Sequence, residues 1–281
     1  MAMADLGDIR LHYMLEGPAD GLPVVFSNGL GTDLHMWEPL LPHLPPEWRI
    51  LRYDRRGHGL SDVTPAPYTM GVLVRDTERL LDHLGIGPCV FVGLSLGGMV
   101  AQGLAVKRPD LIRALVLSNT AARIATAEIW EDRARMARAG GLEALADASL
   151  ARWFSPKFRA NPEIARWREM FVTSPLEGWL GGAAAIAGTD FYTTTANLRL
   201  PVLGIAGDRD GSTPPDLVRE TVELVPGAAF ALLRGAGHLP QIEQPEAYAA
   251  ALTGFLRDTG IWPPRAGSCG HESCGPVCGG A

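Results

Sequence analysis

A serine in a glycine-rich turn is the residue of this chain best suited to chemistry. Ser95 stands in the run Gly93-Leu94-Ser95-Leu96-Gly97, after the apolar run 89–92 and before a helix-like run over 96–107. A serine hydroxyl is a poor nucleophile unless a base reaches it and its oxygen faces the substrate. A tight turn between a strand and a helix meets both needs and leaves no room for side chains at the two glycines. The pattern predicts a nucleophilic serine, and a glycine-rich connection with a bystander serine is the alternative.

A histidine late in the chain is the candidate base. His238 follows the apolar run 229–233 through Gly235-Ala236-Gly237, so it should lie just past the carboxyl end of a strand, where open α/β sheets place their sites. There it would take the proton from Ser95 and later return it to the leaving group. The alternative is a satisfied structural histidine. The histidines without such a context are His12, His35, His43, His58, His83 and His271.

Two aspartates compete for the acid that would orient this imidazole. Asp208 and Asp210 both follow an apolar run over 201–206, which reads as a buried parallel strand. The chain order of serine, acid and histidine holds for either of them. The aspartate that is not used would be a surface or loop-capping carboxylate, which is common near turns.

An oxyanion hole needs two backbone N–H groups aimed at the developing negative charge. We expect one from Leu96, the residue after the nucleophile. The other is expected from Leu30, in the loop Asn28-Gly29-Leu30-Gly31 that follows the predicted strand 23–27. A turn without a catalytic part is the alternative for this loop.

Length and composition limit the class of protein. The 281 residues are 47% hydrophobic and 20% charged, which suits one α/β domain with an inserted cap. A net charge of −6 without a basic tract argues against nucleic acid as a partner. Residues 1–11 lack the sustained apolar core of a secretory signal, and no stretch approaches the roughly 20 apolar residues of a membrane span. We therefore expect a cytoplasmic protein with no membrane partner, of undetermined oligomeric state.

Strand and helix signals alternate in two parts of the chain, 1–120 and 190–262, which we assign to one core. This alternation predicts an α/β fold with a mostly parallel central sheet and helices on both faces. Helices are expected over 71–84, 96–107, 215–225 and 245–257. Strands are expected over 9–15 (at an edge), 23–27, 50–53, 89–92, 114–118, 201–206 and 229–233.

Residues 121–189 are rich in helix signals and show no convincing buried strand, so we expect an inserted helical cap over the site. Most of its arginines must lie on solvated helix faces, while one or two can face the pocket and bind a carboxylate in a bidentate manner. Its aromatic side chains are expected mainly to pack the cap. The tryptophans are Trp130, Trp153, Trp167 and Trp179, and the arginines are Arg123, Arg133, Arg135, Arg138, Arg152, Arg159, Arg166 and Arg168.

Three of the four cysteines, Cys269, Cys274 and Cys278, lie in a final segment, 263–281, that is rich in glycine and proline. This segment lacks the apolar residues needed to pack and is expected to be disordered. The cysteines and His271 leave zinc binding open, but structural zinc sites usually use paired short spacers within a folded module. We expect an inert tail and no metal. The fourth, Cys89, is expected to be a small apolar side chain in a buried strand.

Over residues 5–260 these motifs resemble the α/β-hydrolase family, and in particular the 3-oxoadipate enol-lactonases. The resemblance implies the α/β-hydrolase fold with an inserted helical cap, and it favours Asp210 over Asp208 as the acid. Many relatives carry His-Gly where this chain has Asn28-Gly29, a departure that leaves the backbone donor in place. The runs that carry the resemblance are 28–32 with Met36-Trp37, 54–59, 93–99, 119–121 with Trp130, 152–154, 206–215 and 235–245.

The resemblance also implies an activity: hydrolysis of 3-oxoadipate enol-lactone to 3-oxoadipate, a step of aromatic-compound degradation, through an acyl-enzyme on Ser95. No metal or organic cofactor is implied. The small-molecule substrate is an anionic lactone with a free carboxylate. We expect Arg133 to bind that carboxylate, with Trp130 as a wall of the pocket, because both lie in the first predicted cap helix.

Other activities remain open because the triad reports the reaction class and the pocket sets the substrate. A broad-specificity carboxylesterase or lactonase, a carbon–carbon hydrolase of meta-cleavage products and a perhydrolase would use the same residues. A receptor-like hydrolase fold that binds a ligand and turns it over slowly is the alternative outside enzymes. Haloalkane dehalogenases and epoxide hydrolases are disfavoured, since they need a carboxylate where this chain has Ser95.

Overall fold

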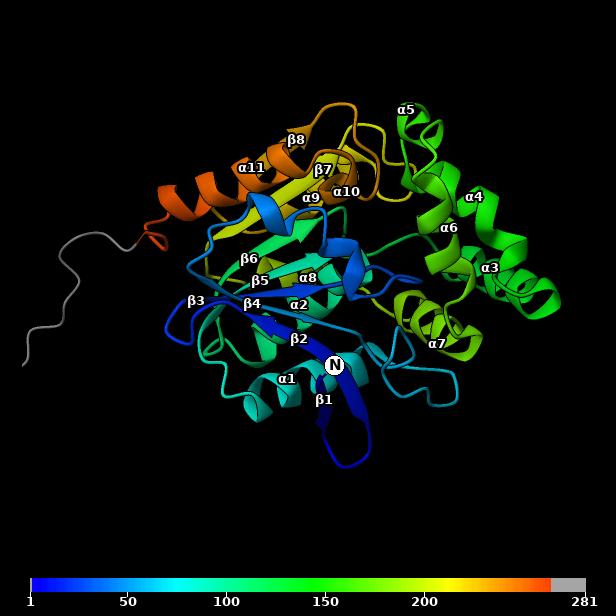
Figure 1. Cartoon of the computed structure of the whole chain (residues 1–281), viewed down its shortest axis with the longest axis horizontal. Helices are drawn as coiled ribbons and strands as arrows, with labels where there is room; N and C mark the ends of the chain where they lie inside the picture. Colours follow the sequence, from blue (N-terminus) through cyan, green and yellow to red (C-terminus); the bar gives the residue numbers. More distant parts are fainter. Residues whose placement is uncertain (1, 264–281) are drawn as a thin grey trace, which may run out of the picture.

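The structure, a computed structural model, describes residues 2–263 and is centred on one eight-stranded sheet, in the order β1-β2-β4-β3-β5-β6-β7-β8 (Figure 1). All neighbouring pairs from β4 to β8 are parallel, whereas β2 pairs antiparallel with both β1 and β4. The mostly parallel sheet predicted from the sequence is confirmed. The strands are β1 Ala2–Asp5, β2 Arg10–Glu16, β3 Leu22–Ser27, β4 Trp48–Tyr53, β5 Cys89–Leu94, β6 Ile112–Ser118, β7 Val202–Gly207 and β8 Ala229–Leu233.

Helices cover the two faces of this sheet. On one face the hydroxyl groups of Tyr53 in β4 and Thr77 in α1 (Met70–His83) form a 2.8 Å hydrogen bond. Helix α2 (Leu96–Lys107) packs beside α1 on the same face. On the other face Trp37 of the 3-10 helix η1 (Leu34–Trp37) contacts Phe26 of β3 and Tyr248 of α11 (Pro245–Asp258). The remaining core elements are η2 Leu41–His43, α9 Pro215–Glu223 and α10 Pro240–Glu243.

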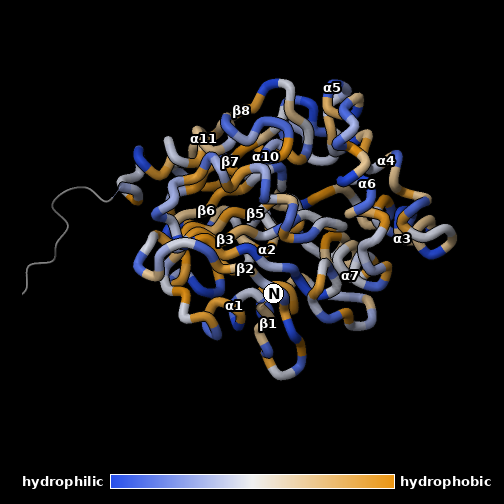
Figure 2. Tube along the Cα trace, in the orientation of Figure 1, coloured by the Kyte–Doolittle hydropathy of each residue, from blue (hydrophilic) through white to orange (hydrophobic). Residues whose placement is uncertain are grey.

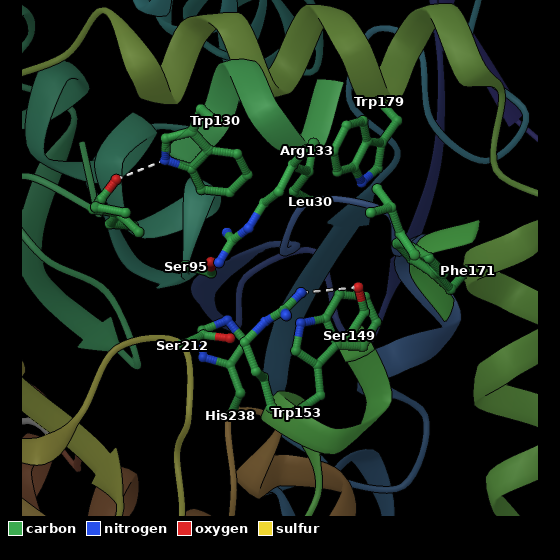
Figure 3. Close-up of a pocket in the computed structure, with 14 residues that line it drawn as sticks. Leu30, Ser95, Trp130, Arg133, Ser149, Trp153, Phe171, Trp179, Ser212 and His238 are labelled. Atoms are coloured by element: carbon green, nitrogen blue, oxygen red, sulfur yellow. Dashed lines mark hydrogen bonds between the residues drawn. The ribbon is translucent and has the colours of Figure 1, made fainter. Parts of the chain in front are cut away.

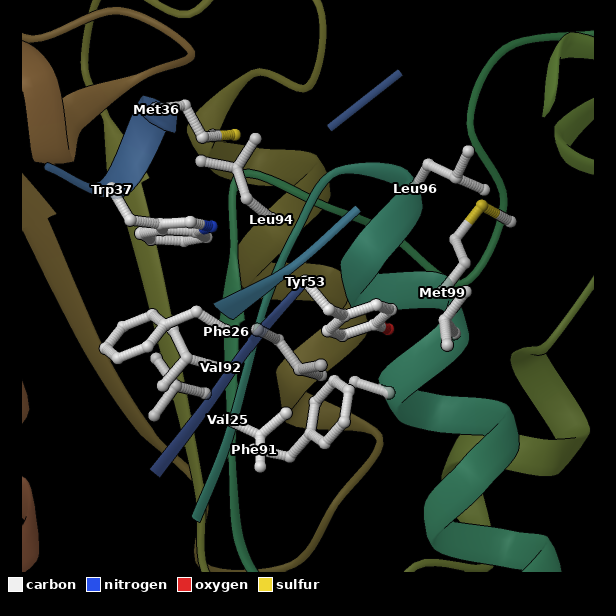
Figure 4. Close-up of a cluster of buried hydrophobic side chains, with 14 of the residues drawn as sticks. Val25, Phe26, Met36, Trp37, Tyr53, Phe91, Val92, Leu94, Leu96 and Met99 are labelled. Carbon is white, nitrogen blue, oxygen red and sulfur yellow. The ribbon is translucent and has the colours of Figure 1, made fainter. Parts of the chain in front are cut away.

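The central strands are buried on both faces, as parallel strands between helices are expected to be. Every residue of β5 and of β7 is buried, including Cys89 at 0% exposure. Figure 2 shows the strands as the hydrophobic centre of the trace. In Figure 4 Trp37 and Met99 lie on opposite sides of the strands, so the core has two layers separated by the sheet.

The strand predicted at the edge, 9–15, is the second strand of the sheet. β2 (Arg10–Glu16) lies between β1 and β4, and β1 (Ala2–Asp5) is the outer strand, with Ala4 as its one fully buried residue. Four residues with a single inward side chain carry almost no alternation pattern. The pairing with β2, and not a pattern of its own, therefore defines this strand.

Six helices connect β6 to β7, and side chains of four of them, α3, α4, α6 and α7, line the pocket described below. The last of them, α8, lies beyond residue 189, the predicted end of the helical segment. No helix within residues 2–263 is long and apolar enough to cross a bilayer. The expectations for the cysteine-rich tail fall on residues outside the described part of the chain. The connecting helices are α3 Ala127–Gly140, α4 Glu143–Trp153, α5 Pro156–Arg159, α6 Ile164–Val172, α7 Leu176–Ala187 and α8 Tyr192–Ala196.

Candidate active site

Ser95 lies on a strained turn between β5 and α2. Its φ of 55° and ψ of −119° are outside the regions that L-residues favour. Close approach of the backbone explains the two glycines: a Cβ at Gly97 would lie 2.2 Å from the Ser27 carbonyl oxygen, and one at Gly93 would lie 2.4 Å from the Gly97 carbonyl oxygen. The turn therefore presents the serine side chain at the end of the strand and in front of the first turn of α2.

His238 and Asp210 meet in a buried pair at the same edge of the sheet. The imidazole Nδ1 lies 2.8 Å from Asp210 Oδ2, and the two residues are 3% and 6% exposed. An N–H on Nδ1 that donates to the carboxylate leaves Nε2 as the acceptor that a general base needs. Ser95 and His238 line one pocket. Within residues 2–263 no hydrogen bond joins Ser95 Oγ to the imidazole, and such bonds often tighten only when substrate is bound.

The structure distinguishes the two aspartates left open by the spacing. Asp210 contacts the imidazole, whereas Asp208 accepts a hydrogen bond from the Gly235 backbone N–H at 2.7 Å and so caps the turn before His238. Asp210 is therefore the candidate acid, and the contact of Asp208 with Gly235 is that of a loop-capping carboxylate.

Several donors hold the Asp210 carboxylate in its charged form. Burial alone would raise the pKa of Asp210, but the charge on His238 and the hydrogen bonds outweigh it and hold that pKa below its usual value. Asn119, for which the sequence motifs predict no role, donates from Nδ2 to Oδ2 at 2.8 Å. The other donors are Thr213 Oγ1 at 2.7 Å, Ser212 N at 2.7 Å and Thr213 N at 3.0 Å.

Two backbone amides beside Ser95 have no acceptor within residues 2–263, those of Leu30 and Leu96. The carbonyl of each preceding peptide is bonded on the opposite side: Gly29 O accepts from Arg55, and Ser95 O accepts from Thr120 Oγ1 at 2.6 Å. Because a trans peptide points its N–H away from its C=O, both N–H groups are directed away from these partners. The pair meets the requirement for two free donors next to the candidate nucleophile.

The Leu30 loop is held by Arg55 and His58, for which the sequence motifs predict no role. The buried Arg55 guanidinium donates to the carbonyls of both Asn28 and Gly29, the latter at 2.7 Å. His58 Nε2 accepts from the Gly31 N–H at 3.1 Å. Burial, helped by the nearby charge of Arg55, lowers the pKa of His58 to about 3, so the imidazole is neutral and keeps this acceptor. Both residues follow β4, which pairs in parallel with β3, and their position after a strand was the available signal.

The pocket is closed by aromatic and apolar side chains of the connecting helices (Figure 3). Trp130 and Arg133 of α3, predicted as the wall and the carboxylate partner, both line it. Trp130 is fixed by a 2.7 Å hydrogen bond from Nε1 to the Ile124 carbonyl, and the Arg133 guanidinium lies 4.7 Å from the Trp130 ring centre. The other lining residues are Leu30, Ser95, Ile124, Ala125, Leu145, Ser149, Arg152, Trp153, Phe171, Trp179, Ser212 and His238.

Helix α4 is tied to the loops that carry the acid and the histidine. The Trp153 carbonyl accepts from the His238 N–H at 2.7 Å, and the Arg152 carbonyl accepts from the Gly211 N–H at 3.0 Å. Glu243 accepts from the N–H of Ser155 at 3.2 Å and from that of Gly237 at 2.7 Å. The end of α4 is thus part of the scaffold of the site as well as a wall of the pocket.

Comparisons with known proteins agree with this architecture. A family model described as the alpha/beta hydrolase fold matches residues 23–245. A protein named 3-oxoadipate enol-lactonase 2, from Acinetobacter baylyi, is 33% identical over 252 residues, which cover 89% of this chain and 94% of that protein.

Two solved structures are similar over most of their length. The crystal structure of an enol-lactonase from Burkholderia xenovorans has a TM-score of 0.88 and 37% identity, and the match covers 91% of this chain and 100% of that one. A thermophilic esterase from Thermogutta terrifontis, determined with malate bound, has a TM-score of 0.83 and 34% identity, covering 89% of this chain and 94% of that one. The chain therefore belongs to the α/β-hydrolase family.

Proposed function

We propose that this protein is a serine hydrolase that opens 3-oxoadipate enol-lactone to 3-oxoadipate, in the degradation of aromatic compounds. The observation that carries the proposal is the shared pocket: Ser95 on its strained turn and the Asp210-oriented His238 line it together with cationic side chains. The similarity to enol-lactonases over about nine-tenths of the chain supports the choice of substrate.

The reaction begins with transfer of the Ser95 hydroxyl proton to His238 Nε2 as Oγ attacks the lactone carbonyl. The oxyanion accepts hydrogen bonds from the free N–H groups of Leu30 and Leu96, and the N-terminus of α2 adds its positive dipole end. Collapse of the tetrahedral intermediate breaks the ring C–O bond. The leaving group is an enolate, which takes the proton held by His238 and becomes the ketone of the product, so the imidazole is neutral again.

Water then completes the turnover. His238 accepts a proton from water as the hydroxide attacks the acyl carbonyl, and Ser95 leaves with the proton returned by the imidazole. Asp210 keeps the imidazole in one tautomer and stabilises its charged form in both steps. Arg133 binds the free carboxylate of the substrate, and Trp130 forms the wall against which its apolar part lies.

The test is the loss of ultraviolet absorbance of 3-oxoadipate enol-lactone, measured for the wild type and for Ser95→Ala. Rapid turnover that disappears in Ser95→Ala is the expected result. No turnover of the lactone together with brisk hydrolysis of simple aryl esters would keep the nucleophile and overturn the substrate. Failure to hydrolyse either substrate would overturn the proposal that this protein is a serine hydrolase.

A broad-specificity carboxylesterase is the second candidate. It is favoured by the apolar walls of the pocket, where Leu145, Phe171 and Trp179 offer no group that selects one acyl chain. The similarity to the thermophilic esterase supports it as well. A kcat/KM for neutral aryl esters equal to or above that for the lactone would favour this candidate.

A further inference from the structure

A second guanidinium faces the proposed active site, and it has no assigned role. Arg152, near the end of α4, lines the pocket with Arg133 of α3. Among the lining residues there is no aspartate or glutamate. Within residues 2–263 neither guanidinium forms a salt bridge, although both are half-buried. Two positive charges are therefore held in a partly desolvated space without a counter-charge.

The other arginines of segment 121–189 are either paired with a carboxylate or exposed to solvent. Arg123, Arg135, Arg166 and Arg168 each form an ion pair with a carboxylate. Arg138 and Arg159 are exposed to solvent. Only Arg133 and Arg152, of the eight in this segment, line the pocket.

The two guanidiniums also affect each other. Burial, and after it the positive charge of Arg152, lowers the pKa of Arg133 to about 10. Burial lowers the pKa of Arg152 as well. Both remain charged at neutral pH, and each favours an anion in the pocket. The only hydrogen bond of the Arg152 side chain, within the described residues, goes to Ser149 Oγ at 3.2 Å, which leaves most of its donors free.

We propose that Arg152 and Arg133 form one anion subsite whose charge matches a short dicarboxylate, so that the pocket binds the ring-opened product and similar dianions more tightly than monoanions. The inference rests on the proposed function, because hydrolysis of a lactone that carries one carboxylate creates a second. One carboxylate neutralises one guanidinium, whereas a dianion neutralises both. Short dicarboxylates are then competitive ligands, and the product inhibits its own formation.

The position of Arg152 links this subsite to the reacting groups. Its own carbonyl accepts from Gly211, next to Asp210, and the following carbonyl accepts from His238. A carboxylate that binds the Arg152 side chain is thereby held at a set place relative to the acid and the histidine. These are main-chain bonds, so a change of the Arg152 side chain leaves them in place.

The experiment measures binding of adipate and of monomethyl adipate to the Ser95→Ala protein by calorimetry, since this variant does not hydrolyse the ester. We expect adipate to bind at least about 10-fold more tightly, equivalent to ~1.4 kcal/mol. Adding Arg152→Gln should reduce the ratio to about threefold or less, and Arg152→Lys should give an intermediate ratio because it keeps the charge and loses the bidentate fork. Adding Arg159→Gln, at an exposed arginine of α5, is the matched control and should leave the ratio unchanged.

Equal binding of the two probes, or an unchanged ratio in Arg152→Gln, would overturn the inference. Circular dichroism of each variant verifies folding, and Arg152→Lys keeps the test informative if Arg152→Gln does not fold. The lactone assay on the wild type is read separately. Preference for adipate without lactone turnover would retain the subsite and reject the substrate, whereas lactone turnover without the preference would reject the subsite alone.

Discussion

Asn119 donates a 2.8 Å hydrogen bond from its side-chain amide to Asp210 Oδ2, the same oxygen that faces His238 Nδ1. Asn119 follows β6 with a φ of 44°, a left-handed conformation that asparagine tolerates better than most residues. It is fully buried and also donates to the Gly237 carbonyl at 3.3 Å. One side chain thus positions the acid and the loop that carries the histidine.

Loss of this donor should lower kcat/KM. Asn119→Asp keeps the shape and the backbone preference but places a second carboxylate against Asp210, which raises the pKa of Asp210. Loss of a hydrogen bond to a charged group costs ~1.5–3 kcal/mol, so we expect kcat/KM to fall by roughly 10- to 100-fold at pH 7, and further at lower pH. The measurement is the pH profile of aryl ester hydrolysis. Thr253→Val, which removes a buried hydroxyl within α11, is the control; a profile parallel to the wild type in Asn119→Asp would contradict the role.

His58 should make the folded protein sensitive to acid. Its pKa is about 3 in the folded state and near 6.5 when unfolded. The stability linked to this group is fully present above about pH 6.5 and is lost as the pH falls toward 3, at up to ~1.4 kcal/mol per pH unit for one proton. His58→Gln, which keeps an acceptor for Gly31, should flatten the dependence of the unfolding free energy on pH between 6 and 4.

Urea unfolding at several pH values measures this slope, with His43→Gln at an exposed histidine as the control. Equal slopes of unfolding free energy against pH for the wild type and His58→Gln would show that this imidazole does not resist protonation.

His58→Leu removes the acceptor for Gly31 altogether, so it should lower kcat for an aryl ester by about tenfold or more while KM changes little, as expected for a displaced oxyanion donor.

Arg133→Gln should raise KM for the enol-lactone more than for a neutral aryl ester, because only the lactone has a carboxylate for the guanidinium. A lost charge-assisted contact of ~1.5–3 kcal/mol corresponds to roughly 10- to 100-fold in KM for the lactone. Arg135→Gln, on the same helix but paired with Asp132 at the surface, should change neither value. An equal loss on both substrates would count against carboxylate binding by Arg133.

Two glycines in helices should respond to alanine in opposite directions. A Cβ at Gly178 of α7 would lie 1.7 Å from the Gly57 carbonyl oxygen, so Gly178→Ala must push α7 away from the loop after β4 and should destabilise the protein by about 1–3 kcal/mol. At Gly254 of α11 no atom lies within 4 Å of the added Cβ, and Gly254→Ala should stabilise by about 0.5–1 kcal/mol. Chemical denaturation measures both, and a neutral Gly178→Ala would refute the close packing of α7.

The side chains proposed to react could be located from the sequence because each lies shortly after a strand. Ser95, Asp210 and His238 stand one to five residues beyond β5, β7 and β8, and parallel strands bring such positions to one edge. The residues that hold the Leu30 loop could not be found in the same way. Arg55 and His58 reach this loop because β4 lies beside β3 in the sheet. Local sequence patterns predict strands but not the order in which the strands pair.

The helices between β6 and β7 show a similar limit. Periodicity predicts that these helices exist, but it does not tell which of their seven arginines turn inward. That choice depends on how α3 and α4 pack against each other and on the two carbonyls of α4 that meet the Asp210 and His238 loops. The sequence predicts no strand at β1 for a different reason, since four residues are too few for an alternation to be recognised.

The bonds from Arg152 O to Gly211 N and from Trp153 O to His238 N bear on how members of this family can be recombined. Main-chain bonds do not depend on which side chains are present, so point substitutions in α4 can reshape the pocket without weakening these two hydrogen bonds. A chimera that exchanges the whole segment 121–189 would have to form both hydrogen bonds with the backbone of another parent. The crossover that preserves catalysis is one that inherits residues 143–155 from the same parent as residues 207–243.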